Sequence, residues 1–183
     1  MVMIDKNISF LPINISVLTI SDSRTIDNDK SGKLLKDRII QSGHVFKEQK
    51  IVKDEKNEII NILEKWSANQ EIDVILTTGG TGLTGRDITP EATESVFEKT
   101  IDGFGEMFRW LSFQKIGTSA LQSRATAGVK NGKYIFCLPG SPSACKDAWD
   151  QILSHQLDIR NRPCNFVEIL PRLKENKLYR NKK

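Results

Sequence analysis

A run of glycine and threonine follows an apolar segment in the first half of the chain. Ile72–Thr78 is rich in apolar, β-branched residues and predicts a buried strand, and Gly79, Gly80 and Gly82 come directly after it. Glycines at the end of a strand let successive backbone N–H groups turn toward one point, which forms a cradle for an anion. An ordinary tight turn uses the same residues. Both interpretations are open at this point.

The spacing of Gly80, Gly82 and Gly85 matches GxGxxG, but its context argues against a dinucleotide site. The motif follows the third predicted strand rather than the first, its helix begins only near Thr89, and no second strand ends in an acid about 20 residues later. A Walker-type phosphate loop is also excluded, because no Gly-Lys-Ser/Thr follows the glycines.

A second glycine turn occurs at Leu138–Pro142, where Ser141 is expected to cap a helix. Two such turns, each leading into a helix, could bind two phosphates or one extended anion. Asp54 and Asp87 lie close to predicted turns, and carboxylates beside phosphates are useful when Mg²⁺ lies between them. The structural alternatives are a helix cap for Asp54 and a turn-forming role for Asp87.

Other polar residues have simpler explanations. Glu106 and Arg109 are spaced i, i+3 and would form a surface ion pair, and Ser123–Arg124 would only begin a strand. Cys137 lacks a neighbouring base, which disfavours a nucleophilic thiol. The two histidines lie far apart and lack metal-ligand spacing, so we expect no zinc site.

The predicted elements that position these residues alternate between strand and helix. This order predicts an α/β fold with a doubly wound, mostly parallel sheet and helices on both faces. Right-handed crossovers place the carboxyl ends of the strands at one edge, where Ser21–Arg24, Asp54 and Thr78–Gly82 would converge. The predicted strands span 13–20, 44–52 and 72–78, and the helices between them span 32–42 and 54–68, with Ser31 and Asp54 as N-caps and Gly43 ending the first helix.

The second half predicts further helices and a hairpin. Thr89 is an expected N-cap followed by Pro90, which suits the first position of a helix. Asn131-Gly132 between two apolar runs is typical of a type I′ hairpin turn. The predicted helices span 89–97, 105–115 and 142–157, the hairpin strands span 126–129 and 133–138, and little periodicity follows residue 158.

Composition indicates one globular domain. The chain has 183 residues, of which 38% are hydrophobic and 27% are charged. No stretch approaches the length of a membrane span, and no secretory signal is evident, so we expect a cytoplasmic protein without membrane contact. Its three cysteines are expected to be reduced packing residues.

The positive charge is confined to the end of the chain. The net charge is +4, but six basic residues and one acid lie in 172–183, which leaves residues 1–171 at −1. We therefore predict a domain over 1–171 and a basic tail over 172–183. A frayed, solvated tail is favoured over a nucleic-acid-binding segment, so we expect no nucleic-acid partner.

Four motifs, in order along the chain, resemble the molybdopterin-binding domain family of molybdenum cofactor biosynthesis. The likeness extends over residues 13–166, which is most of the chain. The motifs are Thr77–Gly82, Arg86–Ala92, Gly103–Glu106 and Leu138–Ser141.

The resemblance implies a three-layer α/β domain that assembles as a trimer or hexamer. It implies binding of molybdopterin, an anionic pterin with a dithiolene and a terminal phosphate. Active relatives transfer AMP from Mg-ATP to that phosphate and release pyrophosphate before molybdate insertion, so a molybdate-insertion enzyme is an implied partner. The alternative is a protein that binds molybdopterin without adenylyltransferase activity.

Individual roles follow from the matching positions. The resemblance implies catalytic roles for Asp54 and Asp87, with Asp87 as a ligand of Mg²⁺. The intact Arg86–Pro90 segment favours a working enzyme. The implied substrate-binding residues are Ser21, Asp22, Thr78, Gly79, Gly80, Thr81, Gly82, Thr89, Glu106, Ser123, Pro139, Gly140 and Ser141, with Ser21, Asp22, Glu106 and Ser123 in one cleft.

Overall fold

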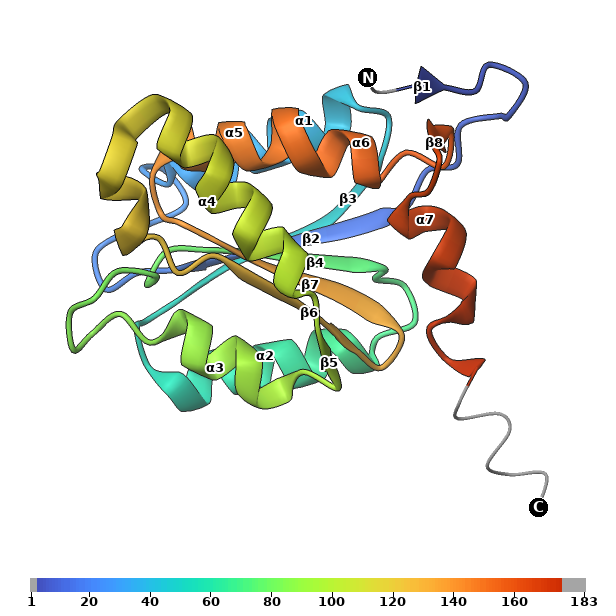
Figure 1. The fold of residues 1–183 in the computed structure, drawn as a ribbon. Coiled ribbons are helices and arrows are strands. Elements are labelled where there is room, and N and C mark those ends of the chain that lie inside the picture. Colours follow the sequence, from blue (N-terminus) through green and yellow to red (C-terminus); the bar gives the residue numbers. More distant parts are fainter. Residues whose placement is uncertain (1–2, 176–183) are drawn as a thin grey trace.

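A six-stranded sheet forms the centre of the molecule (Figure 1). The computed structural model describes residues 3–175. The strand order is β3-β2-β4-β7-β6-β5, with parallel pairing from β3 to β7 and antiparallel pairing from β7 to β5. The predicted mostly parallel sheet is therefore confirmed. The strands are β2 (Asn14–Ile20), β3 (Val45–Val52), β4 (Val74–Thr78), β5 (Lys99–Thr100), β6 (Thr126–Lys130) and β7 (Lys133–Leu138).

Helices cover both faces of the sheet, which gives the predicted three layers (Figure 1). One face carries α1 (Lys30–Gln41), α4 (Asp102–Ile116), α5 (Pro142–Ala148) and α6 (Ser154–Gln156), and the other carries α2 (Lys56–Ala68) and α3 (Thr89–Val96). A π-helical turn over Trp149–Leu153 joins α5 to α6, and a 3₁₀ segment over Gly117–Gln122 follows α4. The remaining elements are β1 (Met3–Ile4), β8 (Asn161–Arg162), α7 (Phe166–Ile169) and a 3₁₀ turn over Leu170–Arg172.

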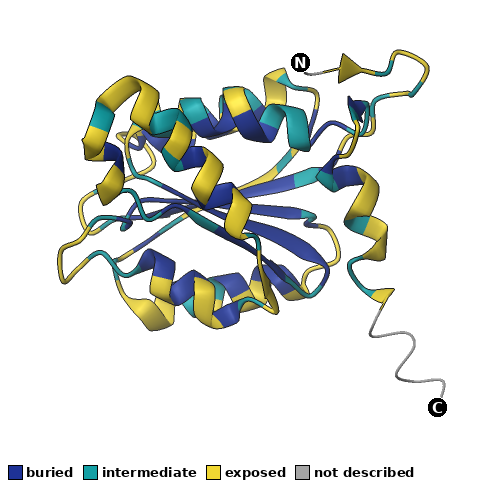
Figure 2. Cartoon of the chain, viewed as in Figure 1, coloured by how far each residue is buried: buried dark blue, intermediate teal, exposed yellow. Residues whose placement is uncertain are grey.

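Burial on both faces follows from the two-residue period of a strand. In β2, Ile15 and Val17 pack in one core with α1 and α4, whereas Leu18 and Ile20 pack in the other with α2. Figure 2 shows the central strands as buried and the outer surfaces of the helices as exposed. A buried parallel sheet of this kind holds the loops at its edge on a rigid support.

Three expected helix caps are wrong, namely those of α1 and α2 and, as described below, that of α3. Asp29, not Ser31, caps α1 and accepts a hydrogen bond from the Gly32 amide at 2.9 Å. The Ser31 hydroxyl instead donates to the Gly140 carbonyl at 2.6 Å, which ties α1 to the second glycine turn. Asp54 does not cap α2, which begins at Lys56 after an extended Glu55 without any side-chain cap. The side chain of Asp54 is therefore available to the edge of the sheet.

Two other local signals, the Asn131-Gly132 turn and the Ser141 cap, agree with the structure. Asn131 and Gly132 both have positive φ, at 51° and 74°, as a type I′ turn requires. Ser141 caps α5 by accepting from the Ala144 amide at 3.2 Å. Thr89, the expected cap of α3, is instead its first helical residue.

The ends of the chain add a small sheet that sequence patterns did not indicate, because β1 and β8 have two residues each and pair antiparallel. Residues 176–183 of the predicted basic tail lie outside the described residues.

Cys137 and Cys145 are buried, but Cys164 is exposed, so the packing prediction is wrong for that thiol. Within residues 3–175, no helix has the length and apolar character needed to traverse a bilayer.

Candidate functional site

The two glycine turns meet at the carboxyl edge of the sheet. β4 and β7 are parallel neighbours with Thr78 opposite Leu138, so both strands end at the same level. The Thr78 hydroxyl donates to the Pro139 carbonyl at 2.9 Å, and the Gly79 amide donates to the Leu138 carbonyl at 3.2 Å. The turns thus form one surface, at the edge where right-handed crossovers were expected to place the strand ends.

A cavity of about 240 Å³ opens over these turns. We call it the small cavity. Loops that follow four strands contribute to it, since β2, β3, β4 and β7 all end at this edge. Its lining residues are Thr19, Ile20, Ser21, Arg24, Asp29, Ser31, Asp54, Thr78, Gly79, Gly80, Asp87 and Gly140.

Gly80 occupies a tightly confined position beside this cavity. Its φ is +61°, and an added β-carbon would lie 2.3 Å from Thr89 Oγ1 and 2.8 Å from Asp54 Oδ1. Thr89 Oγ1 is buried and has no hydrogen-bond partner among the described residues. A buried hydroxyl beside an open cradle remains available for hydrogen bonding. Bare backbone is therefore required here, and the turn is not an arbitrary tight turn.

Three carboxyl groups lie at the same edge, and their negative charges are stabilised by neighbouring groups to different extents. Asp22 forms a bidentate pair with Arg86, which lowers the pKa of that carboxyl. The Thr84 hydroxyl donates to Asp87 and lowers the pKa of Asp87. The pKa of Asp54 is raised, first by burial and then by the neighbouring Asp22 charge. Of these three carboxyl groups, Asp54 is therefore the one whose charged form its surroundings disfavour.

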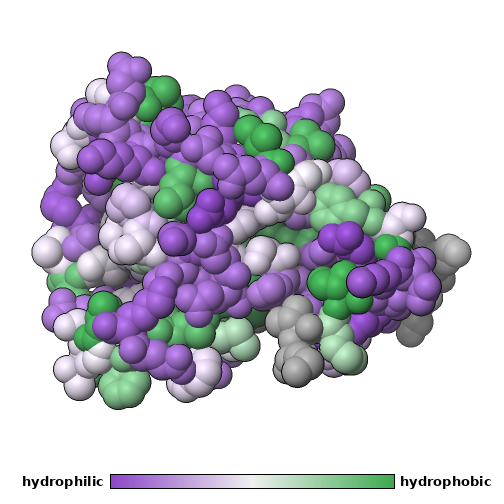
Figure 3. All heavy atoms as spheres, turned by 90° about the horizontal axis from the view of Figure 1, so that it is seen from above, coloured by the Kyte–Doolittle hydropathy of each residue, from purple (hydrophilic) through white to green (hydrophobic). Residues whose placement is uncertain are grey.

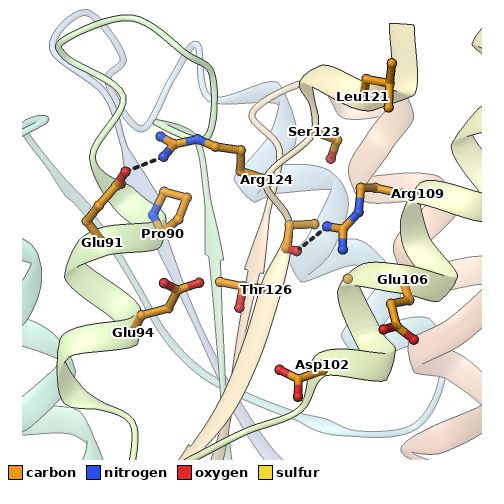
Figure 4. A pocket seen from close by; sticks show the side chains of 12 residues that line it. Pro90, Glu91, Glu94, Asp102, Glu106, Arg109, Leu121, Ser123, Arg124 and Thr126 are labelled. Carbon is orange, nitrogen blue, oxygen red and sulfur yellow. Dashed lines mark hydrogen bonds and ion pairs between the residues drawn. The ribbon is translucent and has the colours of Figure 1, made fainter. Parts of the chain in front are cut away.

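A larger cavity of about 590 Å³ lies between α3 and α4 (Figure 4). We call it the large cavity. Glu106 and Ser123 lie here and not among the residues that line the small cavity, so the single cleft expected for the site is divided in two. Arg109 donates to the Ala125 carbonyl at 3.1 Å in place of the simple surface pair expected with Glu106. Ser123 Oγ is buried without a partner among the described residues.

Sequence reasoning placed Arg24 at this edge but missed Asp29 and Ser31 as lining residues of the small cavity, and it underestimated Arg124. The Arg124 guanidinium donates to the Gly82 carbonyl at 2.8 Å and to the Asp87 carbonyl at 2.6 Å. Asp29 had a visible signal, because it immediately precedes a helix and is a cap type. Arg124 had none, since its acceptors are main-chain carbonyls of a different segment.

Other predicted residues adjoin the small cavity without lining it. Asp22 lies next to a lining residue of the small cavity, because the Asp54 amide donates to Asp22 Oδ1 at 3.3 Å. Pro139 is a hydrogen-bond acceptor beneath the turns. Thr81 and Gly82 continue the first turn, and their carbonyls accept from Arg124. The exposed Ser141 acts as the cap of α5.

The sequence profile of the family described as "Probable molybdopterin binding domain" matches residues 16–159, which include both turns and both cavities. The chain belongs to this family. The match confirms the resemblance of the four motifs and agrees with the three-layer fold.

Individual relatives of this molybdopterin-binding domain agree with that assignment. The chain is 48% identical over 157 residues to molybdenum cofactor biosynthesis protein B of Escherichia coli (strain K12), which covers 86% of this chain and 92% of that protein. A crystal structure of a molybdenum cofactor biosynthesis protein B superposes with a TM-score of 0.82 at 37% identity, covering 90% of this chain and 98% of that one. The crystal structure of the tungsten cofactor synthesizing protein MoaB from Pyrococcus furiosus superposes with a TM-score of 0.71 at 36% identity. The match covers 79% of this chain and 92% of that one.

The donor set of this molybdopterin-binding domain fits Mg²⁺ only together with a bound anion. Among residues 3–175, no three His, Cys, Asp or Glu side chains are grouped to hold a metal by themselves. Asp54 and Asp87 both line the small cavity, beside turns suited to phosphate. Mg²⁺ is commonly held by one or two carboxylates plus substrate phosphates. A cation there would also favour the charged form of Asp54, whose pKa is raised first by burial and then by the Asp22 charge.

We expect Asp54→Asn to raise thermal stability at neutral pH. Folding favours the neutral form of Asp54, so its ionisation costs stability as pH rises through the raised pKa, and this cost is absent below the ordinary value. The variant should melt about 1–3 °C higher than the wild type at pH 7.5. The two proteins should converge near about pH 3, where both side chains are uncharged. Differential scanning calorimetry measures this, and a lower Tm at pH 7.5 would contradict it.

Proposed function

We propose that this chain acts in molybdenum cofactor biosynthesis by binding molybdopterin and transferring AMP from Mg-ATP to its terminal phosphate. The observation that carries the proposal is the small cavity, which brings two glycine turns together with Asp54 and Asp87. Backbone N–H groups at such turns suit phosphates, and the carboxylates suit a cation shared with them. Membership of the molybdopterin-binding family supports the identity of the acceptor.

The reaction is a displacement at the α-phosphorus of ATP. An oxygen of the pterin phosphate forms a bond to that phosphorus, the bond to the bridging oxygen of the β-phosphate breaks, and pyrophosphate leaves. The attacking phosphate is already ionised at pH 7, so no strong general base is needed. The residues agree with this, because no histidine or cysteine lines the small cavity. Burial raises the pKa of Cys137 to about 12, which excludes a thiolate nucleophile there.

The contribution of the protein is alignment and charge compensation. The turns at Gly79–Gly80 and Gly140 would hold phosphate oxygens, and Thr89 Oγ1 offers a further donor behind Gly80. Mg²⁺, when bound by Asp54 and Asp87, would neutralise charge on the phosphates. The rigid parallel strands below fix both turns relative to each other.

The large cavity suits the pterin. Its volume of about 590 Å³ is ample for a bicyclic ring, whereas the small cavity suits phosphates. Glu106 and Asp102 supply carboxylates that accept hydrogen bonds, and a pterin presents N–H donors at its pyrimidine edge. The unpartnered Ser123 Oγ adds a polar group at the same wall. Figure 4 shows Asp102 and Glu106 on α4, across the opening from Glu91 and Glu94 on α3.

Product analysis tests the proposal. Purified protein incubated with molybdopterin and Mg-ATP should release one pyrophosphate per adenylylated pterin, and EDTA should abolish the release. A binding protein without transferase activity would retain molybdopterin by fluorescence titration but release no pyrophosphate. That outcome would show that the protein binds and carries molybdopterin without acting as an adenylyltransferase. A molybdate-insertion enzyme is the expected acceptor of the adenylylated product.

We also propose that the chain forms a homo-oligomer, a trimer or hexamer, through α4. Large apolar side chains are exposed along this helix and the 3₁₀ segment after it, and monomers seldom leave such a set uncovered. Figure 3 views this layer from above, with hydrophobic residues as green areas among polar ones. The residues are Met107 at 51%, Trp110 at 62%, Phe113 and Ile116 at 57% and Leu121 at 81% exposure.

Trp110→Glu is therefore expected to dissociate the oligomer. The carboxylate would have to be buried without a partner at an apolar contact, which costs several kcal/mol per subunit, about 3 or more. Light scattering coupled to size exclusion should give the mass of a smaller species. Ile26→Glu, at a similarly exposed apolar side chain on the β2–α1 loop, is the matched control and should keep the wild-type mass. An unchanged mass for Trp110→Glu would exclude α4 as the contact.

A further inference from the structure

Arg124 connects the two cavities. It lies two residues before β6 and lines the large cavity, where Figure 4 shows its guanidinium directed at Glu91 on α3. Its other nitrogen atoms point to the segment over residues 81–87, which we call the first-turn loop. Nε donates to the Gly82 carbonyl at 2.8 Å, and Nη2 donates to the Asp87 carbonyl at 2.6 Å.

These contacts hold both ends of the first-turn loop. Within the loop, the Asp87 amide donates to the Thr84 carbonyl at 3.0 Å, and the Thr84 amide donates to Asp87 Oδ2 at 2.9 Å. Those bonds close the loop on itself but do not attach it to the rest of the domain. Arg86 attaches the loop only through exposed ion pairs with Asp22 and Glu55, which contribute little. The Arg124 side chain is only 27% exposed, so it provides the better-shielded attachment.

The direction of the Asp87 carboxylate depends on this attachment. The bond from Arg124 holds the peptide after Asp87, and the bond from the Asp87 amide to the Thr84 carbonyl holds the peptide before it. Together the two bonds fix the direction of the Asp87 Cα–Cβ bond. The Asp87 side chain faces the small cavity, whereas Arg124 faces the large one. We propose that Arg124 is a positioning residue that orients Asp87 toward the phosphates and cation, an inference that rests on the proposed function.

Hydrogen exchange tests the attachment without requiring activity. In Arg124→Gln, the amides of Thr84, Asp87 and Thr89 should exchange at least about 10-fold faster. The bond from the Thr89 amide to the Gly80 carbonyl spans the base of the loop, and the bonds inside the loop open more often once Arg124 no longer holds both of its ends. Arg38→Gln is the matched control, since Arg38 is similarly half-buried and pairs with Asp150 at 2.8 Å far from the loop. It should leave these amides unchanged. Unchanged exchange in Arg124→Gln would overturn the proposal.

Kinetics test the consequence for Asp87. Arg124→Gln should lower kcat about 10–100-fold and raise the Mg²⁺ concentration for half-maximal rate. Arg124→Lys should not restore kcat, because one ammonium cannot span two carbonyls and Glu91 as a guanidinium does. If Arg124→Lys had the kcat of the wild type, the positioning role would be overturned, and the positive charge of residue 124 would be sufficient to explain its effect. A wild type that releases no pyrophosphate would defeat the proposed function, while the exchange experiment would still decide the role of Arg124.

Discussion

Asp87→Asn is expected to bind molybdopterin normally and to transfer AMP at least about 100-fold more slowly than the wild type. Asparagine keeps the size of the side chain and one acceptor oxygen, so the bond from the Thr84 amide can persist. What it removes is the negative charge that faces the small cavity beside Asp54. Pyrophosphate release measures turnover, and quenching of pterin fluorescence measures binding.

The alternative role of Asp87 as a turn former predicts a different result. Asp87 accepts from both the amide and the hydroxyl of Thr84, so part of its function is structural. If that were its whole function, the variant would lose thermal stability and pterin binding together. Asp37→Asn, which removes a surface carboxylate paired with Lys33, is the control for loss of one negative charge. Full turnover of Asp87→Asn with Mg-ATP would exclude the metal role.

Gly80→Ala is expected to reduce AMP transfer by about 100-fold or more. The new methyl group would meet Thr89 Oγ1 at 2.3 Å and Asp54 Oδ1 at 2.8 Å, distances that no β-carbon tolerates, so both groups must move. The positive φ of +61° adds backbone strain of about 1–2 kcal/mol. Because the displaced groups border the phosphate cradle, both ATP binding and turnover should fall. Calorimetry should show a Tm lower by about 3–8 °C.

Gly85→Ala provides a matched control in the same loop. A β-carbon at Gly85 would meet no atom within 4 Å. Its effect on stability should stay within about 0.5 kcal/mol, and pyrophosphate release should remain close to that of the wild type. Equal activity of the two variants would show that the cradle at Gly80 does not contact the reacting groups.

Much of the architecture follows from local patterns. The β-branched runs of β2 and β4 are buried on both faces, as a parallel sheet requires, and the intervening helices carry apolar stripes that must cover it. The turn at Asn131-Gly132 and the helix start at Ser141-Pro142 depend only on residues close by in the sequence. Their conformations could therefore be predicted directly. The handedness of the crossovers predicted that the loops gather at one edge, whereas the pairing of β4 with β7 that puts the two glycine turns side by side comes from the structure.

The helix caps show where local patterns stop. Several cap-type residues stand near the start of α1, and any of them satisfies the local requirement. Asp29 occupies the cap, since its carboxylate also accepts from the Thr19 hydroxyl at 2.5 Å and from Gln49 at 2.9 Å. Ser31 is drawn away by the Gly140 carbonyl. Asp54 lies in an analogous position but is directed at the cavity.

The residue types and their order in this chain were enough to determine the α/β sheet, the edge at which its loops gather and the bare backbone of the first glycine turn. Tertiary structure alone decided that the site has two cavities and that Arg124 joins them. The physical reason is that periodicity and capping act between neighbours along the chain. The acceptors of Arg124 and the walls of each cavity instead come from segments that meet only after the helices pack on the sheet.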